Sequence, residues 1–340
     1  MILLIALLFT HVLQNTSNLR SLKFGKDTYV PQQSAAKIKS LKLSTDEYAT
    51  VRNELFQKLQ KENPRMAIEL LKKKMAENPA VLQSCHELLH EVGRESYRKY
   101  EDFGRAIQYQ EEICVSGYIH GIIEEYFQQA EDVDVAMMSV CEKYPEGKYI
   151  TWECYHGIGH GLMYFNDNNL PLSLQKCALL KDSFAQSACA NGAYMENFNA
   201  DDVVHPSQYL DPKDPFASCR NSVFRTDCFM NVAIYTLRAQ NYNYQKVFDM
   251  CKEFKGGDRS SCTLGAGVQM TRRNMDSVDF IDDFCMHQED DQVIPCYDGM
   301  VSWYVGFYGG LKEAEKVCSQ IDRRHRATCE KAVESYGGLF

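Results

Sequence analysis

Residues 247–270 read VFDMCKEFKGGDRSSCTLGAGVQM, and this stretch contains the unit from which most of the chain is built. An amphipathic run ends at Cys251, a polar loop follows, and a second apolar run begins eleven residues later at Cys262. The same arrangement recurs twice farther along, in IDDFC followed by CYDGMVSWY and in AEKVC followed by CEKAVESYG. Apolar residues at helical spacing on both sides of a short polar loop predict a helical hairpin.

The fourteen cysteines keep this pattern from Cys85 onwards and fall into a leading set and a closing set. Consecutive leading cysteines are 29 to 40 residues apart, which is the length of a two-helix repeat. We therefore predict an all-α fold, an α-solenoid of about eight helical hairpins stapled by cysteines. The leading set is Cys85, Cys114, Cys154, Cys189, Cys228, Cys262, Cys296 and Cys329, and the closing set is Cys141, Cys177, Cys219, Cys251, Cys285 and Cys318.

The cysteines also predict disulfide bonds and an oxidising compartment, because their number is even and none lies in a C-x-x-C motif. Each closing cysteine precedes the next leading one across a short loop, and pairing them leaves Cys85 to bond Cys114. An alternative scheme joins the two ends of one hairpin, such as Cys262 with Cys285, and leaves Cys85 and Cys329 at opposite ends of the array. We prefer the first scheme and expect each bond to stabilise the fold by a few kcal/mol.

The chain begins with MILLIALLFTHVL, an apolar run of signal-peptide length. We predict a signal peptide or short anchor over 1–17 and a flexible, lysine-rich lead-in over 18–44. The run has no basic segment before it and no A-x-A cleavage site, so a short signal anchor stays open beside a cleaved signal peptide. A buried N-terminal helix is the other alternative. Together with the cysteines, the apolar run predicts a secreted, periplasmic or otherwise oxidising location.

Two further regions complete the predicted organisation. Residues 45–113 are expected to form N-terminal helices that carry the sequence HELLH, and residues 114–340 the cysteine-led hairpin repeats. Within the first region, Asn63-Pro64 and Asn78-Pro79 each follow an apolar periodic run. Proline suits the first turn of a helix, so each pair predicts a helix start.

In period and hairpin design, the chain over roughly 45–340 resembles the tetratricopeptide class of helical repeats. The resemblance is architectural, because the aromatic and alanine consensus of that class is absent. A small residue stands third after most leading cysteines, which predicts close helix packing; the alternative is that it marks helix starts. These residues are Gly117, Gly157, Gly192, Gly265, Gly299 and Ala332.

Charge and motifs exclude several function classes. The net charge of −9 argues against a general nucleic-acid binder, and no glycine-rich phosphate loop or dinucleotide fingerprint is present. We expect no nucleic-acid partner and a membrane contact only through an N-terminal anchor. The expected partner is a small molecule or a peptide.

Histidines are concentrated in the first part of the array. Five of the nine lie within 75 residues, each after a leading cysteine. CHELLHEVGR and CYHGIGHGLMYF each contain two histidines four residues apart, which lie on one helix face. Glu124 follows His120 by four positions in the same segment. In the next cysteine-led segment, Glu196 and Asn197 lie one or two positions beyond the register of His120 and His160, where the later repeats have Ile234, Val268 and Ser302.

Equivalent helices of successive repeats stand about 10 Å apart, so these side chains can converge on one inner surface. Imidazoles with carboxylates suit zinc, iron or copper. We therefore predict a site for a divalent transition metal. The alternative is a buried, hydrogen-bonded polar ladder. The expected ligands are His86, His90, His120, His156, His160 and Glu196.

Residues 86–90 read HELLH, which resembles the H-E-x-x-H motif of the zincin metalloproteases. The resemblance implies that His86 and His90 hold zinc and that Glu87 is the general base. Glu124 would be a third ligand, with His120 as a substitute. The mixed sheet of zincins is not indicated by the sequence. The second pair, in HGIGH, has no glutamate between its histidines and can serve the same ion or a second one.

Two functions follow as hypotheses. The first is a secreted metal-binding repeat protein that acts as a metal-dependent enzyme, hydrolytic or oxidative, with Glu87 and Glu124 as its catalytic residues. Its site would lie on the inner face of the first four cysteine-led helices. The second is a non-catalytic scaffold whose concave surface binds a protein or peptide. Convergence of the imidazoles of His90, His120 and His160 favours the first.

Overall fold

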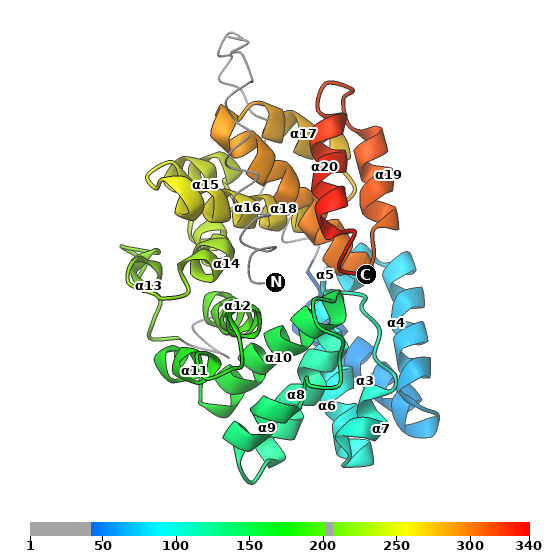
Figure 1. Cartoon of the computed structure of the whole chain (residues 1–340). Coiled ribbons are helices and arrows are strands. Elements are labelled where there is room, and N and C mark those ends of the chain that lie inside the picture. The colour runs from blue at the N-terminus through cyan, green and yellow to red at the C-terminus, as the bar shows by residue number, and fades with distance from the viewer. Residues whose placement is uncertain (1–41, 201–206) are drawn as a thin grey trace. The chain divides into compact units, whose positions relative to one another are not determined.

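The computed structural model describes residues 42–200 and 207–340, and these form a cysteine-stapled all-α solenoid without strands (Figure 1). The predicted fold class is thus confirmed. The predicted signal segment, and the lead-in up to residue 41, lie outside the described residues. Three helices open the described part: α3 (Thr45–Lys61), α4 (Pro64–Glu77) and α5 (Pro79–Gln83).

Long and short helices then alternate along the chain, as the hairpin pattern predicts, and each long helix packs against the next. The long helices are α6 (Cys85–Tyr100), α8 (Gly117–Gln129), α10 (Tyr149–Phe165), α12 (Ser183–Asn199), α14 (Arg225–Ala239), α16 (Gly256–Arg273), α18 (Asp290–Tyr308) and α20 (Arg326–Tyr336). The short helices are α7 (Phe103–Ile107), α9 (Val133–Ser139), α11 (Leu170–Cys177), α13 (Ala217–Arg220), α15 (Tyr244–Cys251), α17 (Val278–Met286) and α19 (Lys312–Gln320).

Local sequence fixes where the first helices begin. Ser44 caps α3 in a capping box with Glu47, in which each side chain bonds the other's backbone N–H. Asn63 caps α4 and Asn78 caps α5, each followed by a proline in the first turn. Both helix starts predicted from the Asn-Pro pairs are therefore confirmed.

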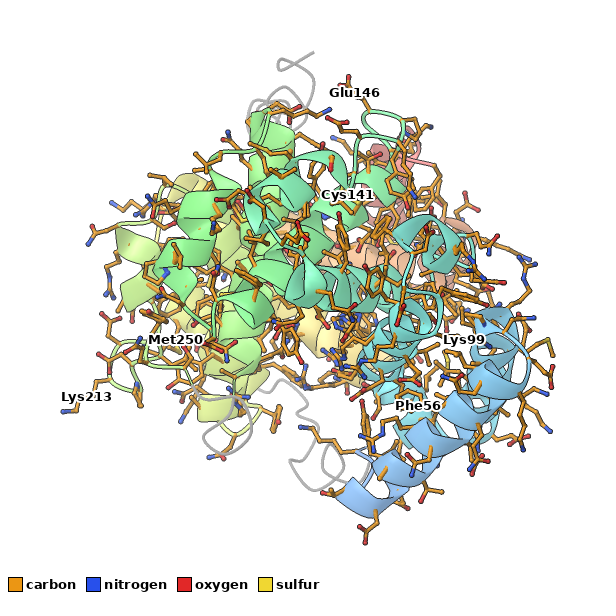
Figure 2. All side chains as sticks on the ribbon, turned by 90° about the horizontal axis from the view of Figure 1, so that it is seen from below. Phe56, Lys99, Cys141, Glu146, Lys213 and Met250 are labelled. Carbon is orange, nitrogen blue, oxygen red and sulfur yellow. A yellow bond between two sulfur atoms is a disulfide. The ribbon has the colours of Figure 1, made fainter. Side chains whose placement is uncertain are left out.

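Seven disulfides staple the hairpins, and no cysteine in the described residues is free. The preferred pairing is confirmed, including the bond between Cys85 and Cys114. Six bonds close short segments between a short helix and the following long helix, with separations of 9 to 13 residues. The seventh links α6 to the segment that leads into α8 across 29 residues. The charged side chains of Glu146 and Lys213, which lie on loops between helices, point outward (Figure 2).

The recurrent glycines lie where neighbouring helices touch, which confirms that they serve packing; all but Gly157, which faces side chains of α8, lie against a backbone carbonyl. A Cβ atom on Gly192 would lie 2.0 Å from the carbonyl oxygen of His156, and one on Gly265 would lie 1.8 Å from that of Met230. Real Cβ atoms do not approach so closely, so a side chain here would separate the helices. The absence of a side chain lets neighbouring long helices bring their facing residues together.

The end of the array returns to its beginning. The backbone N–H groups of Cys114 and Val115 donate to the carbonyls of Phe307 (2.7 Å) and Gly306 (2.9 Å). Trp303 and Phe307 share one hydrophobic core with residues of α6, α8 and α10. The C-terminal repeats therefore support the histidine-bearing helices. Within the described ranges, none of the helices has both the length and the apolar character that crossing a bilayer requires.

Candidate metal centre

Three neighbouring helices, α6, α8 and α10, bring the five predicted histidines into one cluster. The His120 ring centroid lies 5.3 Å from that of His90, 4.8 Å from that of His160 and 5.1 Å from that of His156. The sequence expectation that His90, His120 and His160 converge is therefore met. Four of the rings are buried, and His86 is partly buried.

The first pair, His86 and His90, fixes the tautomer of each ring through its Nδ1 atom. His86 Nδ1 lies 2.8 Å from the carbonyl oxygen of Cys114, which can only accept, so this nitrogen donates. His90 Nδ1 lies 2.8 Å from Glu124 Oε1 and donates to that carboxylate. The two Nε2 atoms face each other at 3.0 Å. In neutral rings both carry lone pairs, and such a contact repels unless a proton or a cation lies between them.

The second pair, His156 and His160, repeats the contact on α10. His160 Nδ1 lies 2.5 Å from Glu196 Oε1 on α12, and the two Nε2 atoms are again 3.0 Å apart. His156 Nδ1 has no hydrogen-bond partner among the described residues, although it is buried. Either tautomer of His156 thus leaves one buried nitrogen unsatisfied, at a cost of about 1–3 kcal/mol.

Between the two pairs lies His120, which is fully buried. Neither of its ring nitrogens has a hydrogen-bond partner within the described ranges. Its Nε2 is 3.3 Å from Glu153 Oε2, but without hydrogen-bond geometry, and that oxygen is also unsatisfied. These orphaned atoms are of the types that ligate transition metals.

The pKa values favour neutral, ligating imidazoles at three positions. Burial, together with the neighbouring histidines, lowers the pKa of His86 to about 3 and those of His120 and His156 well below the usual range. His90 differs: burial lowers its pKa, but the Glu124 carboxylate outweighs burial and the net pKa is raised. A proton on His90 can therefore occupy the gap between His86 and His90 in the metal-free protein.

Two groups of ligand atoms have the spacing that a metal needs. His86, His120 and His160 each offer one atom within 4.8 Å of the others, and so do His90, Glu124 and His160. Nitrogens 3.0 Å apart can both lie about 2.1 Å from one ion. A carboxylate or carbonyl that accepts from the other ring nitrogen is the usual second shell of a metal-bound histidine. Cys114, Glu124 and Glu196 supply these acceptors.

The glutamates predicted from sequence occupy different places. Glu124 is buried and uses both oxygens, one for His90 and one for Arg94. Burial raises the pKa of Glu124, but the opposing effect of His90 and Arg94 is larger, and the net pKa is lowered to about 2. Glu196 contacts His160, so both residues predicted on this face meet the cluster. Glu87 instead forms an ion pair with Arg272 of α16 at 2.8 Å and keeps 47% of its side chain exposed.

Two residues of this cluster were missed by the sequence analysis. Arg94 bonds Glu124, and Glu153 stands beside His120. Both could have been found from helical spacing: Arg94 follows His90 by four positions, and Glu153 precedes His156 by three on the same helix. Burial raises the pKa of Glu153 to about 7.

Comparison with known proteins adds no family assignment: no protein-family model, curated protein or solved structure matches this chain. The tetratricopeptide and zincin resemblances thus rest on the sequence pattern alone, and the site is identified by its geometry.

Proposed function

We propose that this chain is an exported metalloprotein that binds a divalent transition metal, zinc, iron or copper, through the histidines of α6, α8 and α10. We further propose that the bound metal is the centre of an enzyme, hydrolytic or oxidative. The observation that carries the proposal is two Nε2–Nε2 contacts of 3.0 Å, one between His86 and His90 and one between His156 and His160. The Nδ1 atoms of these rings are already hydrogen-bonded, except that of His156, which has no partner among the described residues.

A hydrogen-bonded polar ladder explains these contacts less well. In such a ladder, each buried nitrogen would meet a complementary group, whereas three nitrogens of His120 and His156 meet none in the described part of the chain. A metal ion satisfies lone pairs that have no proton donor, and it replaces the repulsion between the facing Nε2 lone pairs of His86 and His90 by coordination.

Export is supported by the seven disulfides, which indicate an oxidising or extracellular compartment. Catalysis is supported by the three-histidine group of His86, His120 and His160. Three protein ligands leave a fourth position of a tetrahedral ion for water or substrate, as in catalytic rather than structural zinc sites. Such an ion would activate water for hydrolysis, and a redox-active ion would support oxidation.

The zincin type of peptidase is the less favoured form of this chemistry. A zincin glutamate must reach the metal-bound water, whereas the Glu87 carboxylate pairs with Arg272. Glu124 is engaged by His90 and Arg94, which suits a residue that orients a ligand. We therefore infer that Glu124 positions His90 instead of acting as a third zinc ligand. We also infer that Glu87 does not act as a zincin-type general base.

The test is the metal content of oxidised, untagged protein, measured by mass spectrometry. The comparison is between wild type and a variant with His90→Ala, His120→Ala and His160→Ala. We expect at least one equivalent of a transition metal in wild type and none in a variant that keeps its helicity. A variant with His287→Ala and His325→Ala, on the later repeats, is the matched control and should keep its metal.

Absence of metal from wild type, even after reconstitution, would overturn the proposal and favour the non-catalytic scaffold. Enzyme activity is tested separately on the metal-loaded protein, with chromogenic esters, phosphate esters and peptides, and by oxygen consumption. Activity that chelation abolishes and the same metal restores is the expected result. If the metal-loaded protein has none of these activities, the proposed metal binding stands and the proposed catalytic activity is overturned.

A further inference from the structure

The cluster contains two separate histidine pairs, and each has its own supporting carboxylate. On α6 the pair is backed by Glu124 of α8, and on α10 the second pair is backed by Glu196 of α12. In both cases the bond goes to Nδ1 of the second histidine and leaves its Nε2 facing the first histidine at 3.0 Å. The arrangement thus presents two places where a cation can lie between two nitrogens.

The number of donors exceeds what one tetrahedral ion can use. Five imidazoles form the cluster, and the buried Glu153 carboxylate adds a sixth group of ligating type, whereas zinc in proteins takes four ligands almost without exception. One ion held by the first pair would leave the Nε2 atoms of His156 and His160, which face each other at 3.0 Å, without a metal between them.

His120 lies where it can serve both places. Its ring centroid is 5.3 Å from that of His90 on one side and 4.8 Å from that of His160 on the other. His86 and His160 offer ligand atoms within 4.8 Å of each other, so ions bound at the two pairs would be close neighbours. Two-metal sites in enzymes have ions about 3.5–4 Å apart, which lets one hydroxide or substrate oxygen bridge them.

We propose that the centre is dinuclear, with one ion held between the Nε2 atoms of His86 and His90 and a second between those of His156 and His160. This inference rests on the proposed function and specifies its stoichiometry. It divides the group of His86, His120 and His160 between two ions, so each ion is held by one histidine pair, and His120 can complete either ion's ligand set. Imidazole nitrogens as the main donors suit zinc and copper better than magnesium, calcium or manganese, which prefer oxygen. The ligand class is one that bridges two such ions through oxygen, of which hydroxide is the simplest.

The experiment loads metal-free protein with Zn²⁺ in excess, removes unbound ion by gel filtration and measures zinc per chain. Wild type should retain two equivalents. The variants His86→Gln with His90→Gln, and His156→Gln with His160→Gln, should retain one equivalent each. Glutamine keeps a polar side chain, and circular dichroism verifies that the helices remain.

A second measurement uses Cu²⁺ and electron paramagnetic resonance, so that the result does not depend on affinity alone. Two neighbouring Cu²⁺ ions in wild type should couple and reduce the signal per copper, while each double variant should show the full signal of an isolated ion. The dinuclear centre would be overturned if wild type bound one equivalent with an uncoupled signal and either double variant lost it. The proposed function would stand in that case. No metal in any protein would overturn both.

Discussion

The histidine-bearing helices α6, α8 and α10 and the later helices α14, α16 and α18 share one scaffold but differ in their side chains. Both groups are stapled by disulfides and packed through glycines: a Cβ on Gly121 would lie 2.0 Å from the His90 carbonyl oxygen, and one on Gly299 would lie 2.3 Å from that of Leu264. Six positions after the leading cysteine, the first group has His120 and His160, and the second has Ile234, Val268 and Ser302.

The difference shows that this scaffold forms without histidines. Ile234 is buried and its side chain has no polar atom to satisfy, whereas His120 is also buried and leaves two nitrogens unpartnered in the described ranges. Each such atom costs stability without a compensating contact. The buried histidines cost the fold free energy in the first group of helices, and the later helices form without them. Binding of a ligand, here a metal ion, best explains why they are present.

The largest effect is expected from removing the disulfide that belongs to the cluster. Cys85→Ser with Cys114→Ser opens the 29-residue loop, and the Cys114 carbonyl that accepts from His86 loses its anchor. Chain entropy predicts a loss of about 3–4 kcal/mol from the free energy of unfolding. We expect metal to be lost as well, which urea denaturation and metal analysis would measure.

The matched control is Cys318→Ser with Cys329→Ser, which opens an 11-residue loop far along the chain. Its expected cost is about 3 kcal/mol, with metal retained by the folded protein. Equal metal loss in both variants would mean that the first bond has no special role at the site.

Acid should destabilise the metal-free protein through the first group of helices. His86 titrates at about 3 in the folded state and near 6.5 when unfolded, so the unfolded state binds more protons within this window. His120 and His156 act in the same direction. His90 and Glu153, whose pKa values are raised in the folded state, oppose them and favour the folded state in acid. Glu124, whose pKa is lowered to about 2, adds to the loss of stability below its ordinary value of 4.5. The urea midpoint of the metal-free protein should therefore fall as pH decreases from 6.5 towards 3.

The contribution of one histidine can be isolated with His120→Phe, which fills the same buried place without titrating. The fall of the urea midpoint should become shallower in this variant, while His325→Phe in the later repeats should leave it unchanged. A midpoint that is flat or rises in acid would contradict the assignment of neutral imidazoles.

A smaller effect is expected from Glu124→Gln, which keeps the shape but removes the charge that orients His90. Loss of such an outer-shell partner typically weakens metal binding 10–100-fold. The neighbouring Glu125→Gln is the control, because Glu125 pairs with Arg98, whose side chain is 46% exposed. Competition with a chromogenic chelator measures both affinities, and equal affinities would exclude a positioning role for Glu124.

The smallest effect is expected from Glu87→Gln, which breaks the ion pair with Arg272. Because the carboxylate is half exposed, the free energy of unfolding should change by less than about 1 kcal/mol, and metal should remain bound. Any hydrolytic activity should also persist. Loss of activity with full metal content would instead support Glu87 as a zincin-type base.

Much of this architecture could be predicted from sequence because it depends on local signals. The Asn-Pro pairs mark helix starts, and the cysteine spacing gives both the repeat and the bonds. The histidine cluster could be predicted because equivalent positions on stacked helices become neighbours.

What sequence did not reveal depends on contacts between distant segments. The Glu87–Arg272 pair joins residues 185 positions apart, and no local pattern indicates it. The contact between Phe307 and the segment that leads into α8 is of the same kind. It depends on how far the array curves over all of its repeats, which no single repeat reveals. The roles of Arg94 and Glu153 follow only once the helix crossings are known.

The central claim is that the paired Nε2 atoms hold transition metal ions. Anomalous X-ray diffraction from metal-loaded crystals, recorded above and below the absorption edge of the metal, tests it most directly. The account predicts a peak about 2.1 Å from both His86 Nε2 and His90 Nε2, and a second one at His156 and His160. Anomalous peaks elsewhere on the protein, with none at these histidines, would contradict it.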